Sequence, residues 1–588
     1  MTPSTRRTVR LATLLFLLPL AFLAGCHRHR KTTSAPNTTD YADNIRAVVE
    51  KKQLSILRWP NYSDYQPAVS TFYDDRNYEL AWTRNEKPTA TALAFIDEFD
   101  DAAAKGLNPE DYDAALWRGR VMKLAGKSAD AISQFDVAMT VNVMRYISDL
   151  RIGRVNPSHF NFDINVQSKK YDLAEFVSDH VVDATDVPKL IAGVEPDSEQ
   201  YRQTETALGH YLALAKQQQQ GGIHPLPMVE KAITAGQHYE AAGKLLKRLQ
   251  LEDDAPAEDA AAAPDAPTLH VYTRELSDAV RHYQHRHGIE ENGKLGPQTI
   301  KSLNVPLSHR VTQLQDTLER WRWLPDQYLN APLIVNLPEF VLRGYRPDHK
   351  LDFKMKVVVG KVLGEHQTPV FTHMMRYLVF RPYWNVPVDI AKKELVPHMA
   401  ADPGYLESHN FEVTNGKGKV LANYTAKQVA RGSVLVREKP GPKNSLGLVK
   451  FMFPNQYDIY LHSTPAPYLF DRSRRDFSHG CIRVQKPADL AVWVLDGQLD
   501  KDKQPWDLEK VHDAMNDDEH NNRTVLLKTP IPIVIFYVTG EVEDDGEVHF
   551  FDDIYGYDAD LQEVLAKGPP YPVKPEPVAP KTTNGDTV

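Results

Sequence analysis

The hydrophobic pattern of the chain changes its period near residue 330, and this change limits the folds that the sequence can adopt. Before it, apolar residues such as Phe95, Ile96 and Phe99 recur at helical spacing. After it, short apolar or alternating runs such as 333–337 and 353–359 end at Gly, Pro or Asn. The first pattern is typical of amphipathic helices and the second of strands. We therefore expect a multidomain α+β protein, with a helical scaffold followed by a mainly-β domain.

Length and charge set broad limits on function. With 588 residues the chain is long enough for several domains, and its formal net charge is -9. No basic stripe with interleaved aromatic residues is present in the sequence. Nucleic-acid binding is therefore not expected.

The first 26 residues have the pattern of a secretory signal. Three arginines precede the apolar run 11–23, which is too short to span a membrane comfortably, and the segment ends in Leu-Ala-Gly-Cys at Cys26. This ending resembles the bacterial lipobox, which implies cleavage before Cys26, lipidation of its thiol and a lipid-anchored protein in the periplasm. His27 and Arg28 follow, where an Asp would favour the inner membrane, so the outer membrane is expected. The alternatives are an unlipidated signal peptide or an N-terminal anchor helix.

Composition divides the rest of the chain into segments. The scaffold is expected over 45–251, because the periodicity there is mainly helical, and a further scaffold helix is expected over 306–330. Three segments have the composition of tethers or linkers: a polar tether at 27–44, an Asp/Glu/Ala/Pro linker at 252–267, and a disordered Pro/Lys/Thr-rich tail at 566–588.

A compact helical unit is expected over 270–305. Apolar residues at helical spacing precede Gln284, a turn at Asn292-Gly293 and a helix start at Gly296-Pro297-Gln298-Thr299. This pattern resembles the peptidoglycan-binding type 1 module, a small three-helix unit, and implies peptidoglycan glycan as a partner. The alternative is a generic helical hairpin.

The stretch 478–484, Ser-His-Gly-Cys-Ile-Arg-Val, carries the strongest chemical signal. The chain has two cysteines, and if Cys26 is lipidated then Cys481 is the only free thiol. A second histidine, His462, follows the strand pattern at 457–461. A thiolate nucleophile needs a neighbouring imidazole to take its proton and a glycine turn that lets backbone N–H groups approach an oxyanion. From the residues alone, His462 and His479 both remain candidate bases.

Several motifs then point to one family. They are the segments 359–361, 368–371, 382–387, 440–447, 462–465 and 478–484. Together they resemble the YkuD-type catalytic domain of L,D-transpeptidases over 331–558, with a lid at about 391–450. The preceding scaffold and binding module make the layout similar to the YcbB type.

The resemblance assigns roles to individual residues. It implies Cys481 as nucleophile, His462 as general base and the Ser463 carbonyl as the group that orients the imidazole. It places the amides of Gly480 and Cys481, with Tyr460, in an oxyanion pocket. The substrate-binding set that it implies is Ser478, His479, Arg483 and Asn444. No cofactor and no metal are expected, and no Cys/His set in the sequence has the spacing of a zinc site.

The resemblance also implies the reaction. A thioester on Cys481 would release D-Ala from a tetrapeptide stem and pass the acyl group to a second stem, giving a 3→3 peptidoglycan cross-link. Carbapenems would acylate the same thiol, and other cell-wall synthesis enzymes are candidate partners. The alternatives are an L,D-peptide hydrolase on the same fold and a non-catalytic peptidoglycan-binding lipoprotein. Departures from the family pattern at 437–439 and Asp389 lie near the lid and concern substrate preference.

Overall fold

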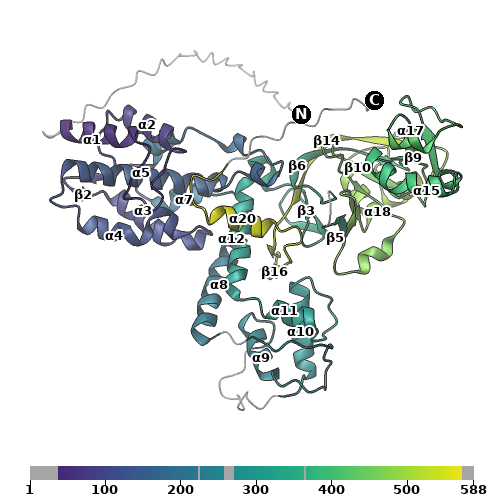
Figure 1. Cartoon of the computed structure of the whole chain (residues 1–588), viewed down its shortest axis with the longest axis horizontal. Helices are drawn as coiled ribbons and strands as arrows, with labels where there is room; N and C mark the ends of the chain where they lie inside the picture. Colours follow the sequence, from purple (N-terminus) through teal and green to yellow (C-terminus); the bar gives the residue numbers. More distant parts are fainter. Residues whose placement is uncertain (1–37, 223–224, 257–269, 363–365, 573–588) are drawn as a thin grey trace, which may run out of the picture.

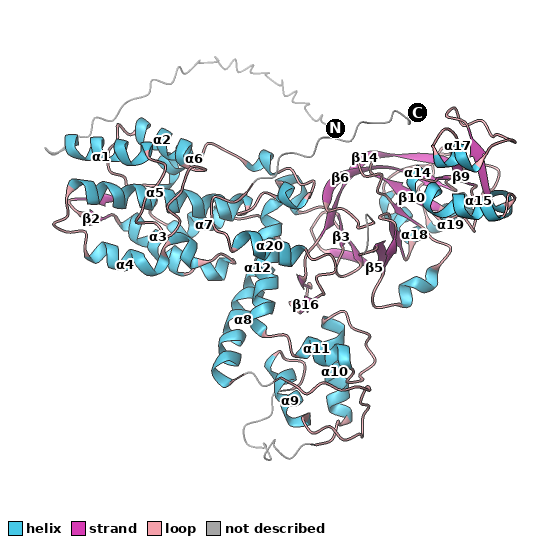
Figure 2. Cartoon of the chain, viewed as in Figure 1, coloured by secondary structure: helices cyan, strands magenta, loops and turns pink. Residues whose placement is uncertain are grey.

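The computed structural model describes residues 38–222, 225–256, 270–362 and 366–572. The signal segment with Cys26, residues 27–37 of the tether, residues 257–267 of the linker and the tail from residue 573 lie outside this described part. Within it, no helix is both long enough and apolar enough to cross a membrane. The expected multidomain α+β fold is confirmed: helices fill the N-terminal part and most strands gather in one C-terminal domain (Figure 2).

The scaffold is a bundle built around one long buried helix, α5 (Ala129–Ile152). Ser128 caps that helix by accepting a hydrogen bond from the Ala131 N–H. Helix α1 begins at Thr38, so residues 38–44, expected in the tether, are helical. The reason is that Ile45 and the residues after it pack on α5, which stabilises the whole helix. The other helices and the small hairpin are α2 (Gln66–Asp75), β1 (Thr83–Arg84), β2 (Lys87–Pro88), α3 (Ala90–Asp100), α4 (Ala114–Met122), α6 (Leu173–Phe176) and α7 (Val187–Val194).

Two long helices, α8 (Glu199–Gly221) and α12 (Leu307–Trp323), run side by side between the scaffold and the binding module (Figure 1). The apolar residues of α12, including Leu314 and Trp323, belong to the hydrophobic core of the C-terminal domain. The segment 306–330, expected as a scaffold helix, packs on α8 and also contributes to the core of the C-terminal domain. It ends in the short helix α13 (Asp326–Leu329).

The binding module contains α9 (Ala242–Leu251), α10 (Arg274–Arg286) and α11 (Pro297–Leu303), which share one hydrophobic cluster. Helix α9, expected in the scaffold, thus belongs to the module, because its apolar face packs against α10. The described residues of the acidic linker, 252–256, directly follow α9 and lie in the module. Among them, Asp254 is 6% exposed and pairs with Arg286.

A curved nine-stranded sheet forms the C-terminal domain. Its order is β12-β5-β13-β11-β10-β6-β14-β3-β4, and an additional pairing of β4 with β5 closes it on itself. The strands are β3 (Leu333–Asn336), β4 (Val341–Tyr345), β5 (Leu351–Gly360), β6 (Phe371–Phe380), β10 (Val449–Met452), β11 (Leu461–His462), β12 (Asp476–Ser478), β13 (Ile482–Val484) and β14 (Arg523–Phe536). Helices α18 (Pro487–Val494) and α19 (Leu508–Asn516) connect β13 to β14.

The lid has its own small sheet and its own core. Strands β7 (Trp384–Asn385), β9 (Leu435–Glu438) and β8 (Phe411–Thr414) pair in that order. Its helices are α14 (Val388–Ile390), α15 (Val396–Ala401), α16 (Tyr405–Ser408) and α17 (Ala426–Ala430). The lid therefore occupies 384–438 and not 391–450, because its apolar residues from Val386 to Val436 form a separate cluster.

The C-terminal segment returns to the scaffold. The hairpin of β15 (Gly540–Val542) and β16 (Val548–Phe550) turns at Gly546, and helix α20 (Tyr557–Leu565) follows. Residues 566–572 fall in the tail that the sequence predicts to be disordered. The structure differs there, because Tyr571 lines a cavity with Asp149 and Arg154 of the scaffold region.

Glu319, a buried carboxylate on α12, contacts residues of the scaffold region. Glu319 is 0% exposed, accepts hydrogen bonds from the Val155 N–H and the Trp323 indole, and pairs with the Arg154 guanidinium at 3.2 Å. Glu319→Ala leaves that cation buried without its partner, so we expect a loss of about 3–5 kcal/mol in the free energy of unfolding.

Urea unfolding followed by circular dichroism measures this loss. The matched control is Glu563→Ala, which removes the exposed pair with Lys567 and should cost less than about 1 kcal/mol. Equal effects of the two substitutions would contradict the role assigned to Glu319.

Candidate active site

The register of two parallel strands brings the predicted residues together. Strand β11 pairs with β13 so that Leu461 lies opposite Ile482, and His462 opposite Arg483. Leu461 and Ile482 are both 0% exposed and point into the core. Neighbouring residues of a strand point to opposite faces. His462 and Arg483 therefore lie on the other face, and Cys481, two residues before Arg483, lies on that face too.

His462 is held as a neutral base. Its imidazole is buried, at 4% exposure, and Nδ1 lies 2.6 Å from the Ser463 carbonyl oxygen. A carbonyl can only accept a hydrogen bond, so Nδ1 carries the hydrogen and Nε2 keeps its lone pair. Burial and then the positive charge of Arg483 lower the pKa of His462 to about 3. At neutral pH the imidazole is uncharged and can accept a proton at Nε2.

Cys481 is a protonated thiol at neutral pH. The residue is half-buried, and its Sγ lies 3.5 Å from the Asp458 carbonyl oxygen. Burial raises the pKa of the thiol to about 11, although hydrogen bonds from the Tyr460 N–H and hydroxyl lower it in part. Burial also raises the pKa of Tyr460, so that its hydroxyl stays protonated and can donate. The thiol thus needs a proton acceptor before it can act as a nucleophile.

The turn before Cys481 is clamped by Thr368. Gly480 has φ +121°, a conformation that side chains disfavour. The Thr368 hydroxyl donates to the Gly480 carbonyl at 2.7 Å and accepts from the Gly360 N–H at 2.9 Å. The Gly480 N–H donates to Ser478 Oγ at 3.1 Å. That amide, expected in the oxyanion pocket, is therefore engaged inside the turn, and Ser478, only 2% exposed, shapes the turn and does not face a substrate.

Removing the clamp gives a specific expectation. Thr368→Val keeps the shape of the side chain but leaves two buried backbone groups without their partner, at a cost of about 1–3 kcal/mol. Because the turn that carries Cys481 then shifts, we expect its acylation rate to fall by about tenfold to hundredfold. Intact-mass spectrometry with a carbapenem measures this rate. Thr368→Ser, which restores the hydroxyl, should recover it; failure to recover would contradict the clamp.

Asn444 is buried inside the protein. It is 0% exposed, and its amide donates to the carbonyls of Pro382, Glu438 and Lys439. Its Oδ1 accepts from the Leu446 N–H at 2.8 Å. Both polar atoms of this amide are used within the protein, and the substrate-binding role stays a prediction. Asn444 shapes the turn whose Leu446 carbonyl contacts the His462 imidazole.

His479 contacts the lid. Its Nε2 lies 2.7 Å from Oε1 of Glu394, which belongs to the helical part of the lid, and its ring packs edge-on against His366 at 4.9 Å between centroids. The carboxylate accepts the hydrogen of Nε2, so the lone pair of the neutral His479 ring lies on Nδ1. Of the two candidate bases, His462 is the one whose strand register places it on the Cys481 face.

Arg483 is suited to bind an anion. Its Nε is buried and has no hydrogen-bond partner among the described residues. The guanidinium lies opposite His462 in the sheet register. A guanidinium N–H can donate a short, charge-assisted hydrogen bond to a substrate carboxylate.

Sequence reasoning did not assign roles to Thr368, Glu394 and Lys450. Lys450 pairs with His462 across β10 and β11, and its ammonium lies 5.4 Å from the Tyr460 ring centroid. Its positive charge lowers the pKa of both His462 and Cys481. In the sequence, Lys450 alternates with the apolar residues of 449–453, which indicates that it lies on the opposite face of its strand. The pattern does not say which strand pairs with it, so the contact with His462 could not be predicted.

A half-buried thiol, a neutral imidazole on the same face and a clamped glycine turn define the class of site. Such a set can form a covalent acyl intermediate on sulfur and pass it to a second group.

Family comparisons agree with this class. Residues 331–512 match the L,D-transpeptidase catalytic domain (YkuD), residues 67–208 match a scaffold domain, and residues 244–303 match a domain described as "Putative peptidoglycan binding domain". The chain thus contains a YkuD-type L,D-transpeptidase catalytic domain preceded by a scaffold and a peptidoglycan-binding-type module, which confirms the resemblance drawn from the motifs.

A curated relative points the same way. A Haemophilus influenzae protein named "Putative L,D-transpeptidase" is 31% identical over 272 residues, which cover 45% of this chain and 53% of the relative. The match therefore spans about half the length of that relative.

Proposed function

We propose that this protein is an L,D-transpeptidase that forms 3→3 peptidoglycan cross-links through a thioester on Cys481. The observation that carries the proposal is the orientation of His462: Nδ1 lies 2.6 Å from the Ser463 carbonyl oxygen, which favours a hydrogen on Nδ1 and a lone pair on Nε2 that can take the Cys481 proton. The match of residues 331–512 to the L,D-transpeptidase catalytic domain supports the substrate class.

The first half-reaction acylates the enzyme. His462 Nε2 takes the proton of the Cys481 thiol while Sγ attacks the carbonyl carbon of the third residue in a tetrapeptide stem, usually diaminopimelate. The carbonyl oxygen becomes an oxyanion, which the Cys481 N–H and the Tyr460 hydroxyl stabilise. When the bond to the terminal D-Ala breaks, the imidazolium returns its proton to the leaving amine. A thioester remains on Cys481.

The second half-reaction forms the cross-link. The side-chain amine of an acceptor stem attacks the thioester carbonyl, and its proton passes to His462 Nε2. Collapse of the second tetrahedral intermediate forms the new amide bond and expels Cys481 as a thiolate, which recovers its proton from His462. The same imidazole therefore serves as base and acid in both halves. Arg483, which is partly exposed beside His462, would bind a carboxylate of the stem through its guanidinium.

We further propose the cellular setting that the signal segment predicts. The chain is exported to the periplasm and held by a lipid on Cys26, with the outer membrane favoured. Its partners are peptidoglycan stem peptides and glycan, together with other cell-wall synthesis enzymes. The binding module would hold glycan close to the enzyme and thereby raise the local concentration of stems.

Incubation with a disaccharide-tetrapeptide tests the proposed reaction. Mass spectrometry of the products should show a dimer with loss of one D-Ala. Tripeptide without dimer would assign the site to hydrolysis, in which water resolves the thioester. An unchanged substrate would favour a non-catalytic peptidoglycan-binding protein and would contradict the proposal.

The contact between lid and turn predicts how the thioester is partitioned. Glu394→Ala removes the lid carboxylate that lies 2.7 Å from His479 Nε2. Since a looser lid admits more water to the thioester, we expect the ratio of tripeptide to dimer to rise a few-fold. The control is Glu407→Ala, an exposed carboxylate on α16 of the same lid. The same product ratio in both variants would dismiss this role for Glu394.

A further inference from the structure

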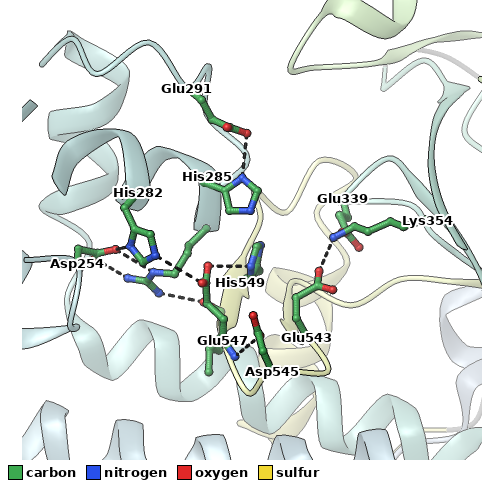
Figure 3. Close-up of polar contacts among 12 residues, drawn as sticks. Asp254, His282, His285, Glu291, Glu339, Lys354, Glu543, Asp545, Glu547 and His549 are labelled. Carbon is green, nitrogen blue, oxygen red and sulfur yellow. Dashed lines mark hydrogen bonds and ion pairs between the residues drawn. The ribbon is translucent and has the colours of Figure 1, made fainter. Parts of the chain in front are cut away.

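Two histidines and a glutamate converge where the binding module meets the C-terminal hairpin (Figure 3). His285 lies on α10 of the module, whereas Glu547 and His549 lie on the turn and second strand of the β15–β16 hairpin. One ligand atom from each of the three lies within 4.8 Å of the others. The active site does not include any of them.

The platform beneath this cluster is fixed by other contacts. Arg286, next to His285, donates to the Val548 carbonyl at 2.9 Å, and the ring of His287 stacks on Phe550 with centroids 5.8 Å apart. His549 itself is 4% exposed. The three side chains therefore approach one another from rigid elements, which is what a preformed binding site requires.

Surrounding groups orient the ring nitrogens. His285 Nδ1 lies 3.0 Å from Glu291 Oε1, so this nitrogen carries the hydrogen and Nε2 is left with its lone pair. A carboxylate behind the imidazole is the usual support of a metal-binding histidine. On the other side, His282 Nε2 lies 3.4 Å from the second carboxylate oxygen of Glu547 and holds that side chain in place.

The central contact of the cluster joins Glu547 and His549. Glu547 Oε1 lies 3.0 Å from His549 Nε2, yet this buried oxygen accepts no hydrogen bond of ordinary geometry from any described residue. With the hydrogen of His549 on Nδ1, a cation between the two atoms would bind both the carboxylate oxygen and the Nε2 lone pair. Tetrahedral ligands at bond lengths of about 2.0–2.1 Å are about 3.4 Å apart, so small side-chain rotations complete the site.

We propose that His285, Glu547 and His549 bind one divalent transition-metal ion, of which Zn²⁺ is the best fit, and that the ion joins the binding module to the hairpin. Two imidazoles and one carboxylate suit Zn²⁺ and disfavour Mg²⁺ and Ca²⁺, which prefer oxygen ligands. The exposed side of the cluster, at His285, leaves a fourth position for water. Because His285 lies far in the sequence from Glu547 and His549, spacing motifs could not reveal this site.

Zinc titration of the full chain tests the proposal. Cys26 and Cys481 are first replaced by Ser, so that no thiol competes for the ion, and a chromophoric chelator reports the affinity for Zn²⁺. We expect one Zn²⁺ per chain. His285→Ala should weaken binding by about 100-fold, and Glu291→Ala, which removes the group behind the imidazole, by about 10- to 100-fold. Co²⁺ added instead should give visible absorption bands typical of tetrahedral nitrogen and oxygen ligands.

The matched control is His238→Ala combined with His270→Ala. These two exposed histidines flank Glu240 elsewhere in the module, with nitrogen–oxygen distances of 3.4 and 3.8 Å. The double variant should bind Zn²⁺ like the parent. Absence of Zn²⁺ binding at micromolar concentration would overturn the proposal, as would binding that survives His285→Ala. His285 is exposed, so its replacement tests the site without unfolding the buried His549 environment.

Discussion

Replacement of Cys481 by Ala should abolish every covalent and catalytic product. In the proposed mechanism the acyl group has no other acceptor atom, because Cys481 is the one free cysteine among the described residues. Removal of a covalent nucleophile lowers catalysis by several orders of magnitude, and the remaining groups cannot form a thioester. Incubated with a carbapenem, the variant should show no mass increase, and with a disaccharide-tetrapeptide it should give neither dimer nor tripeptide.

The interpretation depends on an intact fold. Cys481 is only half-buried, so its truncation to Ala should cost little stability, and the melting temperature should stay within a few degrees of the parent. Cys26→Ser is the matched control, since it removes the other thiol of the chain. That variant should keep full acylation. A dimer formed by the Cys481→Ala protein would end the thioester mechanism.

The order of the domains could be predicted because the secondary structure of each domain follows from local sequence patterns. Helical spacing in the scaffold and alternation from residue 333 onward reflect which face of each element is buried, and this information is present in a short window. The Asp545-Gly546 pair is likewise a local signal, and it predicts the turn of the β15–β16 hairpin.

The limits of the domains could not be predicted, because they depend on which surfaces meet. The amphipathic helix α9 could pack on the scaffold or on the module, and only the three-dimensional arrangement places Leu245 and Leu249 in the module core. Likewise, α12 carries the buried charged residues Glu319 and Arg320, a composition that its sequence pattern alone would assign to a solvent-facing surface.

The candidate active site could also be predicted only in part. The face shared by His462 and Cys481 follows from strand alternation once the pairing of β11 with β13 is known, and the motifs had already indicated both residues. Asn444 shows the opposite case. The resemblance implies a substrate contact for this loop residue, whereas in the structure its amide donates to the carbonyls of Pro382, Glu438 and Lys439. A buried asparagine with that role cannot be distinguished in the sequence from an exposed one.

Replacement of His462 by Gln should slow acylation by about 10²–10⁴-fold near neutral pH, which is the usual contribution of a general base. The thiol pKa of about 11 means that only about one molecule in 10⁴ carries a thiolate near neutral pH, so the variant must react through this small fraction.

The pH profile distinguishes this loss from a structural defect. Without its base, the variant should react about tenfold faster for each unit of pH, up to the pKa of Cys481. The parent should vary much less over the same range, because the His462 pKa of about 3 keeps its imidazole neutral throughout. Carbapenem acylation followed by intact mass between mildly acidic and alkaline pH gives both profiles. His479→Gln is the control: its imidazole is bound to Glu394 of the lid, so its profile should keep the shallow slope of the parent. A steep profile for His479→Gln together with a shallow one for His462→Gln would transfer the role of base to His479.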